Sequence, residues 1–212
     1  MKENDIRFAK LLVLVNGAVP VTLLGWDAWR HQLGANPVNF AILTTGMSAL
    51  VFLMLTLVVT PLRKLGGWNW LIALRRMLGL YAFFYVCLHF FLFFGYDREF
   101  SITSTLTEMG KRKYLLVGIT ALLVMVPLAV TSTNAMIKRL GGKRWRALHR
   151  LTYVAAIAGV LHYYMQVKAD VRKPLAFAAV LTLLLGYRLW DHWWKSKPEP
   201  PAIPSAPFSP KA

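Results

Sequence analysis

Two stretches decide the fold class: "RRMLGLYAFFYVCLHFF" (75–91) and "HRLTYVAAIAGVLHYYM" (149–165). Each begins with basic residues, continues through apolar residues and reaches a histidine, His89 or His162, near its end. About 20 apolar residues let a helix cross the hydrocarbon core of a bilayer. An ionisable ring inside such a helix is costly and usually has a function. The two stretches therefore predict membrane helices that each carry a functional histidine near the end of the apolar run.

The composition of the whole chain agrees with a membrane protein. Hydrophobic residues make up 57% of the 212 residues and charged residues only 16%, and the mean hydropathy is +0.47. These values leave few residues for a water-soluble surface. The net charge of +16 comes from Lys and Arg that lie between apolar runs rather than on one polar face, so no nucleic-acid partner is expected. Cys87 is the only cysteine, which excludes intramolecular disulfides and cysteine-based metal sites.

The apolar runs predict an all-α membrane protein with six transmembrane helices. The predicted segments are 10–29, 39–60, 74–95, 114–131, 149–167 and 174–194. If both termini are cytoplasmic, the inner pieces carry about twice as many Lys and Arg as the outer pieces, as the positive-inside rule requires. The first segment has no A-x-A cleavage site, and Trp26 and Trp29 follow it as interface anchors. It is therefore interpreted as a retained helix.

The predicted membrane domain covers residues 1–195. The remainder, 196–212, is rich in proline and poor in apolar residues, so we expect a disordered cytoplasmic tail. The longest outer loop, 96–113, is too short to fold alone, and its position makes it the expected docking surface for a partner. The sequence contains neither G-x-G-x-x-G nor a Walker A motif. A nucleotide-binding domain is therefore not expected.

A sequence repeat places the two histidines at the same depth. The segments 63–89 and 138–162 each contain a basic pair, Leu-Gly-Gly, a Trp, Ala-Leu and an Arg. A histidine follows that Arg after 13 residues in the first segment and after 12 in the second. Both segments run from the inside to the outside. His89 and His162 are therefore expected near the outer side of two parallel helices.

Two buried imidazoles at one depth can serve as the axial ligands of one haem iron. A helical bundle is a usual place for such a cofactor. The alternative is a pair of histidines that hydrogen-bond between helices. The repeat favours the haem interpretation, because a packing role does not require matched positions.

His149 is a third candidate ligand, near the inner side. It lies 13 residues before His162, which is about 20 Å along a helix. It could hold a second haem, or it could be an interface histidine near lipid phosphates; its partner in the repeat is Arg75, which is not a haem ligand. Arg75 and Arg76 could pair with haem propionates or with a flavin phosphate. The topology favours the alternative that they are positive-inside anchors.

The pattern resembles the ferric reductase-like transmembrane domain, and most closely its MsrQ (YedZ) branch. The similar stretches are "LRRMLGLYAFFYVCLH" (74–89), "TSTNAMIKRLGGKRWRALHRLTYV" (131–154) and "LHYY" (161–164). The resemblance implies haem b held by His89 and His162, with His149 at the position of an inner-haem ligand. Arg75 stands where the di-haem relatives have a fourth histidine, so the resemblance leaves one or two haems open. It also associates FMN with the family.

The resemblance further implies an electron-transfer role in the bacterial inner membrane. Electrons from the quinone pool or from a cytosolic flavin reductase would reach a periplasmic molybdopterin enzyme, MsrP, which reduces methionine sulfoxide and so repairs oxidised proteins. The chain would then be an electron-transfer subunit of an oxidoreductase system rather than its catalytic subunit. The alternatives are a stand-alone haem reductase acting on a metal ion or quinone, and a haem-free transporter or scaffold. A transporter would more often show an inverted repeat than this parallel one.

Overall fold

A computed structural model describes residues 3–195, which form helices and connecting loops without a β-strand. The expectation of a disordered tail at 196–212 lies outside these residues. The elements are α1 (Glu3–Trp29), α2 (Pro37–Gly66), η1 (Asn69–Leu71), α3 (Ile72–Phe91), η2 (Leu92–Asp97), α4 (Ile102–Lys111), α5 (Lys113–Val130), α6 (Asn134–Leu140), α7 (Gly142–Leu148), α8 (Leu151–Gln166) and α9 (Arg172–Lys195).

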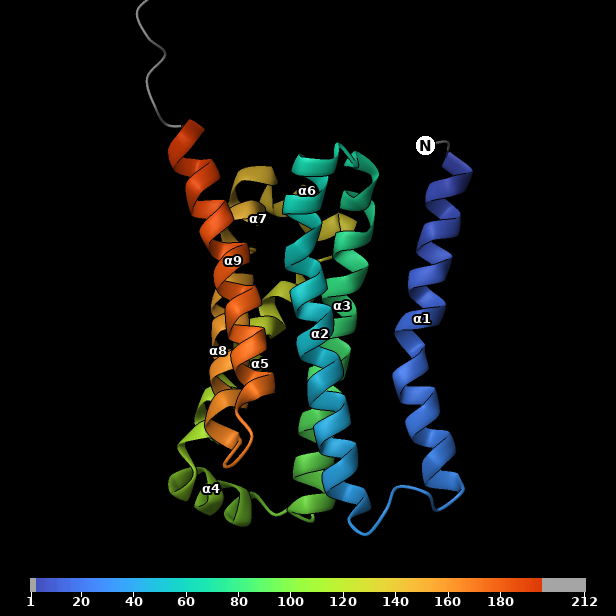
Figure 1. Cartoon of the computed structure of the whole chain (residues 1–212), viewed down its shortest axis with the longest axis vertical. Helices are drawn as coiled ribbons and strands as arrows, with labels where there is room; N and C mark the ends of the chain where they lie inside the picture. The colour runs from blue at the N-terminus through green and yellow to red at the C-terminus, as the bar shows by residue number, and fades with distance from the viewer. Residues whose placement is uncertain (1–2, 196–212) are drawn as a thin grey trace, which may run out of the picture.

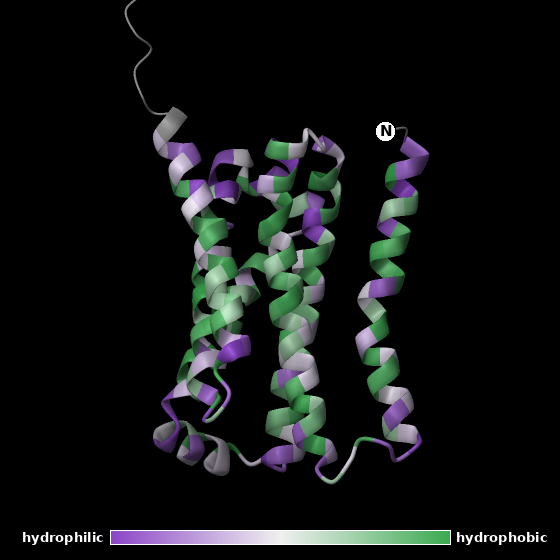
Figure 2. Ribbon diagram, viewed as in Figure 1, coloured by the Kyte–Doolittle hydropathy of each residue, from purple (hydrophilic) through white to green (hydrophobic). Residues whose placement is uncertain are grey.

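The long helices run side by side along the longest axis of the molecule (Figure 1). The beginning of α1, the short helices α6 and α7, and the end of α9 all lie at one end, and α4 lies across the other. Apolar residues fill the middle of the bundle, and polar residues collect at both ends (Figure 2). This distribution is that of a bundle surrounded by lipid, and it confirms the prediction of an all-α membrane protein.

Five helical segments between residues 3 and 195 are long and apolar enough to cross a membrane: α1, α2, α3 with its flanking turns, α5 and α9. The sixth predicted segment corresponds to α8, which has 16 residues. Its length of about 24 Å is less than the hydrocarbon thickness of about 30 Å. The sixth membrane span therefore remains a prediction, although α8 lies within the bundle beside α5 (Figure 1).

Several short helices form where the sequence predicted only loops. The outer connection 96–113 contains α4, which begins because the Ser101 side chain accepts a hydrogen bond from the backbone N–H of Ser104 at 3.1 Å. At the other end, Thr133 caps α6 in the same way through the backbone N–H of Met136 at 3.2 Å. Such caps satisfy backbone donors that a helix start leaves unpaired. The two ends of the bundle are therefore more ordered than the sequence predicted.

The core lies where two helix pairs, α2 with α3 and α5 with α8, meet. Leu57, Ala82, Ala155 and Ala156 are completely buried. Three of these four residues are alanines, whose small side chains let helix backbones approach closely within a membrane. The helix α9 packs against α2 and α8.

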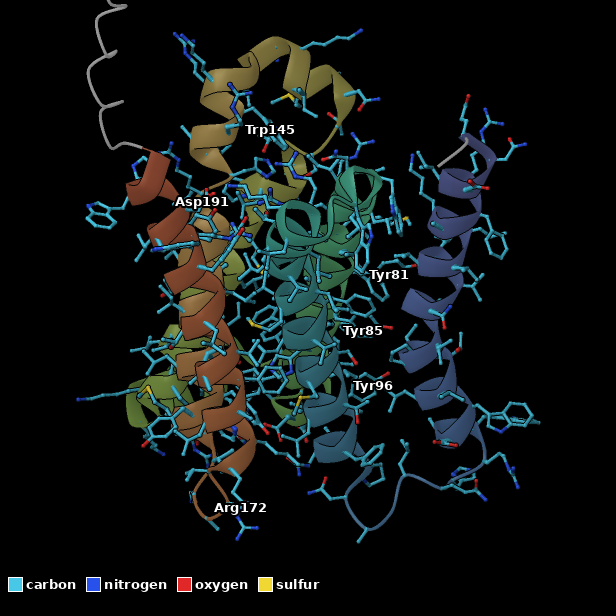
Figure 3. The ribbon with its side chains drawn as sticks, turned by 45° about the horizontal axis from the view of Figure 1, so that its top comes forward. Tyr81, Tyr85, Tyr96, Trp145, Arg172 and Asp191 are labelled. Carbon is cyan, nitrogen blue, oxygen red and sulfur yellow. The ribbon has the colours of Figure 1, made fainter. Side chains whose placement is uncertain are left out.

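Two tyrosines of α3 attach α1 to this core. The Tyr81 hydroxyl donates to the backbone carbonyl of Leu14 at 2.5 Å. The buried Tyr85 hydroxyl donates to the carbonyl of Gly17 at 2.7 Å and accepts from the N–H of Val21 at 3.3 Å. Figure 3 shows both tyrosines on the side of α3 that faces α1. The Tyr85 hydroxyl thus inserts between a carbonyl and an N–H that are normally paired within one helix.

Candidate functional site

His89 and His162 face each other between the two helix pairs. His89 lies near the end of α3 and His162 near the end of α8. Their ring centroids are 6.1 Å apart, and the ring planes are nearly perpendicular, at 88°. The two histidines that the repeat placed at one depth therefore lie together in space.

Each ring is held by a backbone carbonyl of the neighbouring helix. The Nδ1 atom of His89 lies 2.8 Å from the carbonyl oxygen of Ile42, and that of His162 lies 2.7 Å from the carbonyl oxygen of Tyr114. A carbonyl only accepts hydrogen bonds, so Nδ1 carries the proton in both rings. Nε2 then keeps its lone pair, which is the arrangement found in metal-bound histidines.

A glycine next to each carbonyl makes room for the ring. Gly46 lies one turn after Ile42 on α2, and Gly118 lies one turn after Tyr114 on α5. A Cβ atom on Gly46 would lie 2.9 Å from Nδ1 of His89, and one on Gly118 would lie 2.7 Å from Nδ1 of His162. Contacts this short would displace the rings, so both positions need a residue without a side chain.

These glycines show that the sequence repeat is longer than 63–89 and 138–162. "GMSAL" (46–50) on α2 matches "GITAL" (118–122) on α5 in its glycine, its hydroxyl residue and its Ala-Leu pair. The sequence analysis missed this match because it considered only the segments that carry histidines. The two helix pairs therefore repeat one arrangement: the first helix of each pair supplies a carbonyl and a glycine, and the second supplies the histidine.

The distance between the two rings fits one metal ion bound by both. A metal between two imidazoles, with bonds of about 2 Å to each nitrogen, separates the ring centroids by roughly 6 Å. Residues 3–195 contain no group of three or more His, Cys, Asp or Glu side chains that could hold a metal ion. Two protein ligands alone suit a metal that already has four equatorial ligands, as iron has in haem. The residues present therefore fit a haem with two axial histidines.

A cavity of about 770 Å³ surrounds the two rings. It extends inward to Leu53, Met125 and Ala155. These residues are seven positions away from Gly46, Gly118 and His162, respectively, on the same helices. Seven residues correspond to about 10 Å along a helix. Its other end opens at the outer loops. The cavity is thus deep and mostly apolar, as cofactor pockets usually are.

His149 lies apart from this cavity, between α7 and α8. Its ring stacks on Trp145 with centroids 3.9 Å apart, and its Nε2 lies 3.2 Å from the Thr131 hydroxyl. That hydroxyl donates its own hydrogen to the carbonyl of Pro127 at 2.6 Å, so Nε2 of His149 is the donor in the contact with Thr131. In this arrangement His149 does not offer Nε2 as a metal ligand.

The two arginines predicted as cofactor contacts lie at the same end as His149, away from His89 and His162. Arg76 donates to the side-chain oxygen of Asn134 on α6. Arg75 has Tyr153, Arg188 and His149 as its electrostatic neighbours. The structure therefore does not bring Arg75 or Arg76 to the cavity around the two facing histidines.

Arg188 of α9 is a residue that the sequence analysis missed. Its Nη1 donates to the Tyr153 hydroxyl, and its Nη2 donates to the carbonyl of Leu57 at 2.8 Å and to Oγ1 of Thr60 at 3.1 Å. Its Nε atom is buried without a hydrogen-bond partner within the described part of the chain. The available signal was a single arginine inside the apolar run 174–194, since such a residue in a membrane helix usually has a function.

Comparison with known proteins agrees with the geometry. Residues 44–160 match the family model of the ferric reductase like transmembrane component. This chain is 46% identical over 193 residues to the protein-methionine-sulfoxide reductase heme-binding subunit MsrQ of Herminiimonas arsenicoxydans, which covers 90% of this chain and 88% of that protein. The chain belongs to the MsrQ family.

Other members of the MsrQ family are equally similar. The subunit of that name from Rhodospirillum rubrum is 48% identical over 189 residues, or 89% of this chain and 90% of that protein. The one from Ralstonia nicotianae is 45% identical over 195 residues, or 91% of this chain and 90% of that protein. No solved structure matches the chain.

Proposed function

We propose that the chain is a membrane electron-transfer subunit that binds haem b through Nε2 of His89 and of His162. The observation that carries this proposal is the pair of facing rings with centroids 6.1 Å apart, each held through Nδ1 by a carbonyl of another helix. Haem supplies reversible one-electron chemistry when bound. The names of the relatives as haem-binding subunits support the same role.

The chain's own groups prepare this site without a cofactor. The carbonyls of Ile42 and Tyr114 fix the ring orientations and keep the proton on Nδ1. Gly46 and Gly118 allow the rings to lie close to the backbones of α2 and α5. If His89 and His162 both bound the haem iron, they would leave no position for oxygen, which would suit electron transfer better than oxygen binding.

The proposed path runs across the bilayer. We place α8 as the sixth membrane span. The end of the bundle that holds the beginning of α1, the helices α6 and α7, and the end of α9 is placed on the cytoplasmic side of a bacterial inner membrane, because the loops at that end are rich in Lys and Arg. His89 and His162 then lie toward the periplasm. A periplasmic molybdopterin methionine sulfoxide reductase of the MsrP type is the proposed electron acceptor.

The proposed electron donor is the quinone pool or a cytosolic flavin reductase, acting at the opposite end. Arg75, Arg188 and Tyr153 gather there, and the buried Nε of Arg188 still lacks a hydrogen-bond acceptor in the described residues. Such a group can pair with an anionic or carbonyl oxygen of a donor. FMN, whose phosphate has this chemistry, is a candidate ligand at this end.

The first test is the visible spectrum of the detergent-purified protein, oxidised and dithionite-reduced, with haem counted as its pyridine complex. We expect a b-type spectrum that His89→Ala and His162→Ala abolish, because each variant removes one axial ligand. His149→Ala should leave this haem in place. A wild-type protein that contains no haem, even when haem is supplied during expression, would refute the proposal.

The His149→Ala variant also decides the haem count. One haem per chain in both the wild type and this variant fits a single site between His89 and His162. A second equivalent that disappears only in His149→Ala would assign an inner haem to this histidine. That result would require the His149 ring to leave its contact with Thr131.

A further inference from the structure

The charged residues that line the cavity all belong to its outer mouth. They come from the segment after α3, from α4 and the residue that follows it, and from the connection between α8 and α9 together with the first turn of α9. The six residues are Asp97, Arg98, Glu108, Arg112, Lys168 and Lys173. Four are cations and two are carboxylates, so the mouth carries a surplus of two positive charges.

The two carboxylates are neutralised by the two arginines. Asp97 pairs with Arg98 at 2.6 Å, and Glu108 pairs with Arg112 at 2.8 Å and more weakly with Arg98 at 3.8 Å. Arg112 also donates to the Tyr114 hydroxyl at 3.3 Å, and this bond together with the Glu108 carboxylate raises the pKa of Arg112. These four residues therefore satisfy one another and leave no net charge for a ligand.

The surplus charge belongs to Lys168 and Lys173. Neither forms an ion pair with a carboxylate of residues 3–195, and both line the cavity. Lys168 lies in the short connection between α8 and α9, and Lys173 lies in the first turn of α9. Arg172, the first residue of α9, has a side chain that is 93% exposed and does not line the cavity. Figure 3 shows Arg172 at the end of the molecule opposite Trp145.

The cavity therefore has an apolar inner end and a cationic outer end. A flat ligand that enters it must place its apolar edge against Leu53, Met125 and Ala155 and its anionic edge at the mouth, because burying an unpaired charge at the inner end is costly. Haem b has this asymmetry, with two propionate carboxylates on one edge. The number of its carboxylates equals the number of unpaired lysines.

We propose that Lys168 and Lys173 bind the two propionate carboxylates of the haem and so orient its carboxylate edge toward the outer mouth. This inference rests on the haem site between His89 and His162 proposed above. The two lysines also place positive charge near the iron. Positive charge favours the reduced form over the oxidised form, so the lysines raise the midpoint potential.

The test compares purified holoproteins that carry Lys168→Met and Lys173→Met together with the wild type. Haem loss to an excess of a haem-scavenging apoprotein measures retention, and a dye-mediated redox titration measures the midpoint potential. We expect haem loss to be about tenfold faster or more, because charge-assisted hydrogen bonds are lost, and the midpoint potential to fall. The pair Lys168→Arg and Lys173→Arg should restore both values toward those of the wild type.

Arg172→Met is the matched control, because it removes the cation next to Lys173 at the start of α9 without touching the cavity. If the double methionine variant loses haem at the rate of this control and keeps its midpoint potential, the inference is wrong while the haem site itself stands. A wild-type protein without haem overturns the proposed function, and this inference with it.

Discussion

At the scale of single residues, the site depends on atoms that are not ligands. The carbonyls of Ile42 and Tyr114 each receive a histidine Nδ1–H, and Gly46 and Gly118 make that approach possible. Partners of this kind in the outer shell of a metal site decide which ring nitrogen is free and where it points. The same arrangement occurs twice, which indicates that the rings are positioned by the backbone and not by neighbouring side chains.

Replacement of these glycines by alanine should therefore weaken haem binding. In Gly46→Ala or Gly118→Ala the new Cβ would lie 2.9 or 2.7 Å from a histidine Nδ1, so the ring must move and lose its carbonyl. Losing such an outer-shell partner typically costs about 10–100-fold in metal affinity. The rate of haem loss and the low-spin b-type spectrum of each purified variant measure this effect.

Gly186→Ala on α9 is the control for these variants, since a Cβ there meets nothing within 4 Å. It should keep haem as the wild type does. Equal haem retention in all three variants would show that the glycines have no positioning role.

The sequence predicted the histidines but not their supports. His89 and His162 stood out because ionisable rings are rare in apolar runs, and the Leu-Gly-Gly marker related them to each other. Gly46 and Gly118 do not stand out one by one, because glycine is common in membrane helices, and only the match of "GMSAL" with "GITAL" relates them. The pairing of a carbonyl with a ring from another helix depends on tertiary packing, which a single sequence does not reveal.

At the scale of secondary-structure elements, α1 is attached to the bundle through few contacts. Gly17 is its only buried residue, and many of its apolar side chains, such as Phe8, Leu11 and Leu23, are exposed where lipid would surround them. Tyr81 and Tyr85 supply the hydrogen bonds between α1 and α3. The position of α1 therefore depends largely on two tyrosine hydroxyls.

Tyr85→Phe should destabilise the protein without affecting the haem site. The variant removes one hydroxyl that bonds to both Gly17 and Val21 but keeps the ring that stacks on Phe52. Loss of these bonds should lower the free energy of unfolding by about 1–2 kcal/mol. Unfolding in mixed detergent micelles measures this change, and the haem spectrum should stay the same because Tyr85 does not line the cavity.

Tyr164→Phe is the comparison variant. Tyr164 is 47% exposed, and its hydroxyl has no hydrogen bond to the rest of residues 3–195. Its replacement should leave the free energy of unfolding unchanged. If Tyr85→Phe were as stable as Tyr164→Phe, the hydroxyl of Tyr85 would not hold α1 in place.

The sequence predicted the long membrane helices better than it predicted the short helices and turns next to them. The apolar runs located α1, α2, α3, α5 and α9, because long apolar segments leave few alternatives in a membrane. The π-helix η2, which continues α3 from Leu92, has no sequence signature. The amphipathic α4 was interpreted as a loop, since its ten residues are too few to stand out against the neighbouring runs.

At the scale of the whole molecule, the two ends of the bundle differ in the residues that they carry. One end holds α6, α7, Arg75 and Arg188, and the other holds α4 and the mouth of the cavity. The beginning of α1 and the end of α9 both lie at the first of these ends, on opposite sides of the bundle (Figure 1). If electrons cross the membrane, this asymmetry sets the donor side and the acceptor side.

Cysteine labelling tests this orientation. In a Cys87→Ser background, Arg172→Cys should react with a membrane-impermeant maleimide from the periplasmic side, because its side chain is exposed at the end that holds the cavity mouth. Lys143→Cys on α7 should react only after the inner membrane is opened. Labelling in the reverse pattern would invert the proposed direction of electron transfer.

The division of the bundle into two repeated helix pairs has a consequence for biosynthesis. His89 and Gly46 belong to the first pair, and His162 and Gly118 belong to the second. A ribosome that has just released α3 has made only one half of the cavity and one of its two facing rings. Since chains are made from the N-terminus, the cavity is complete only after α8 has entered the bilayer. If the chain binds haem as proposed, loading would therefore follow the late stages of membrane insertion, and a chain truncated before α8 would lack His162 and with it one of the two facing rings.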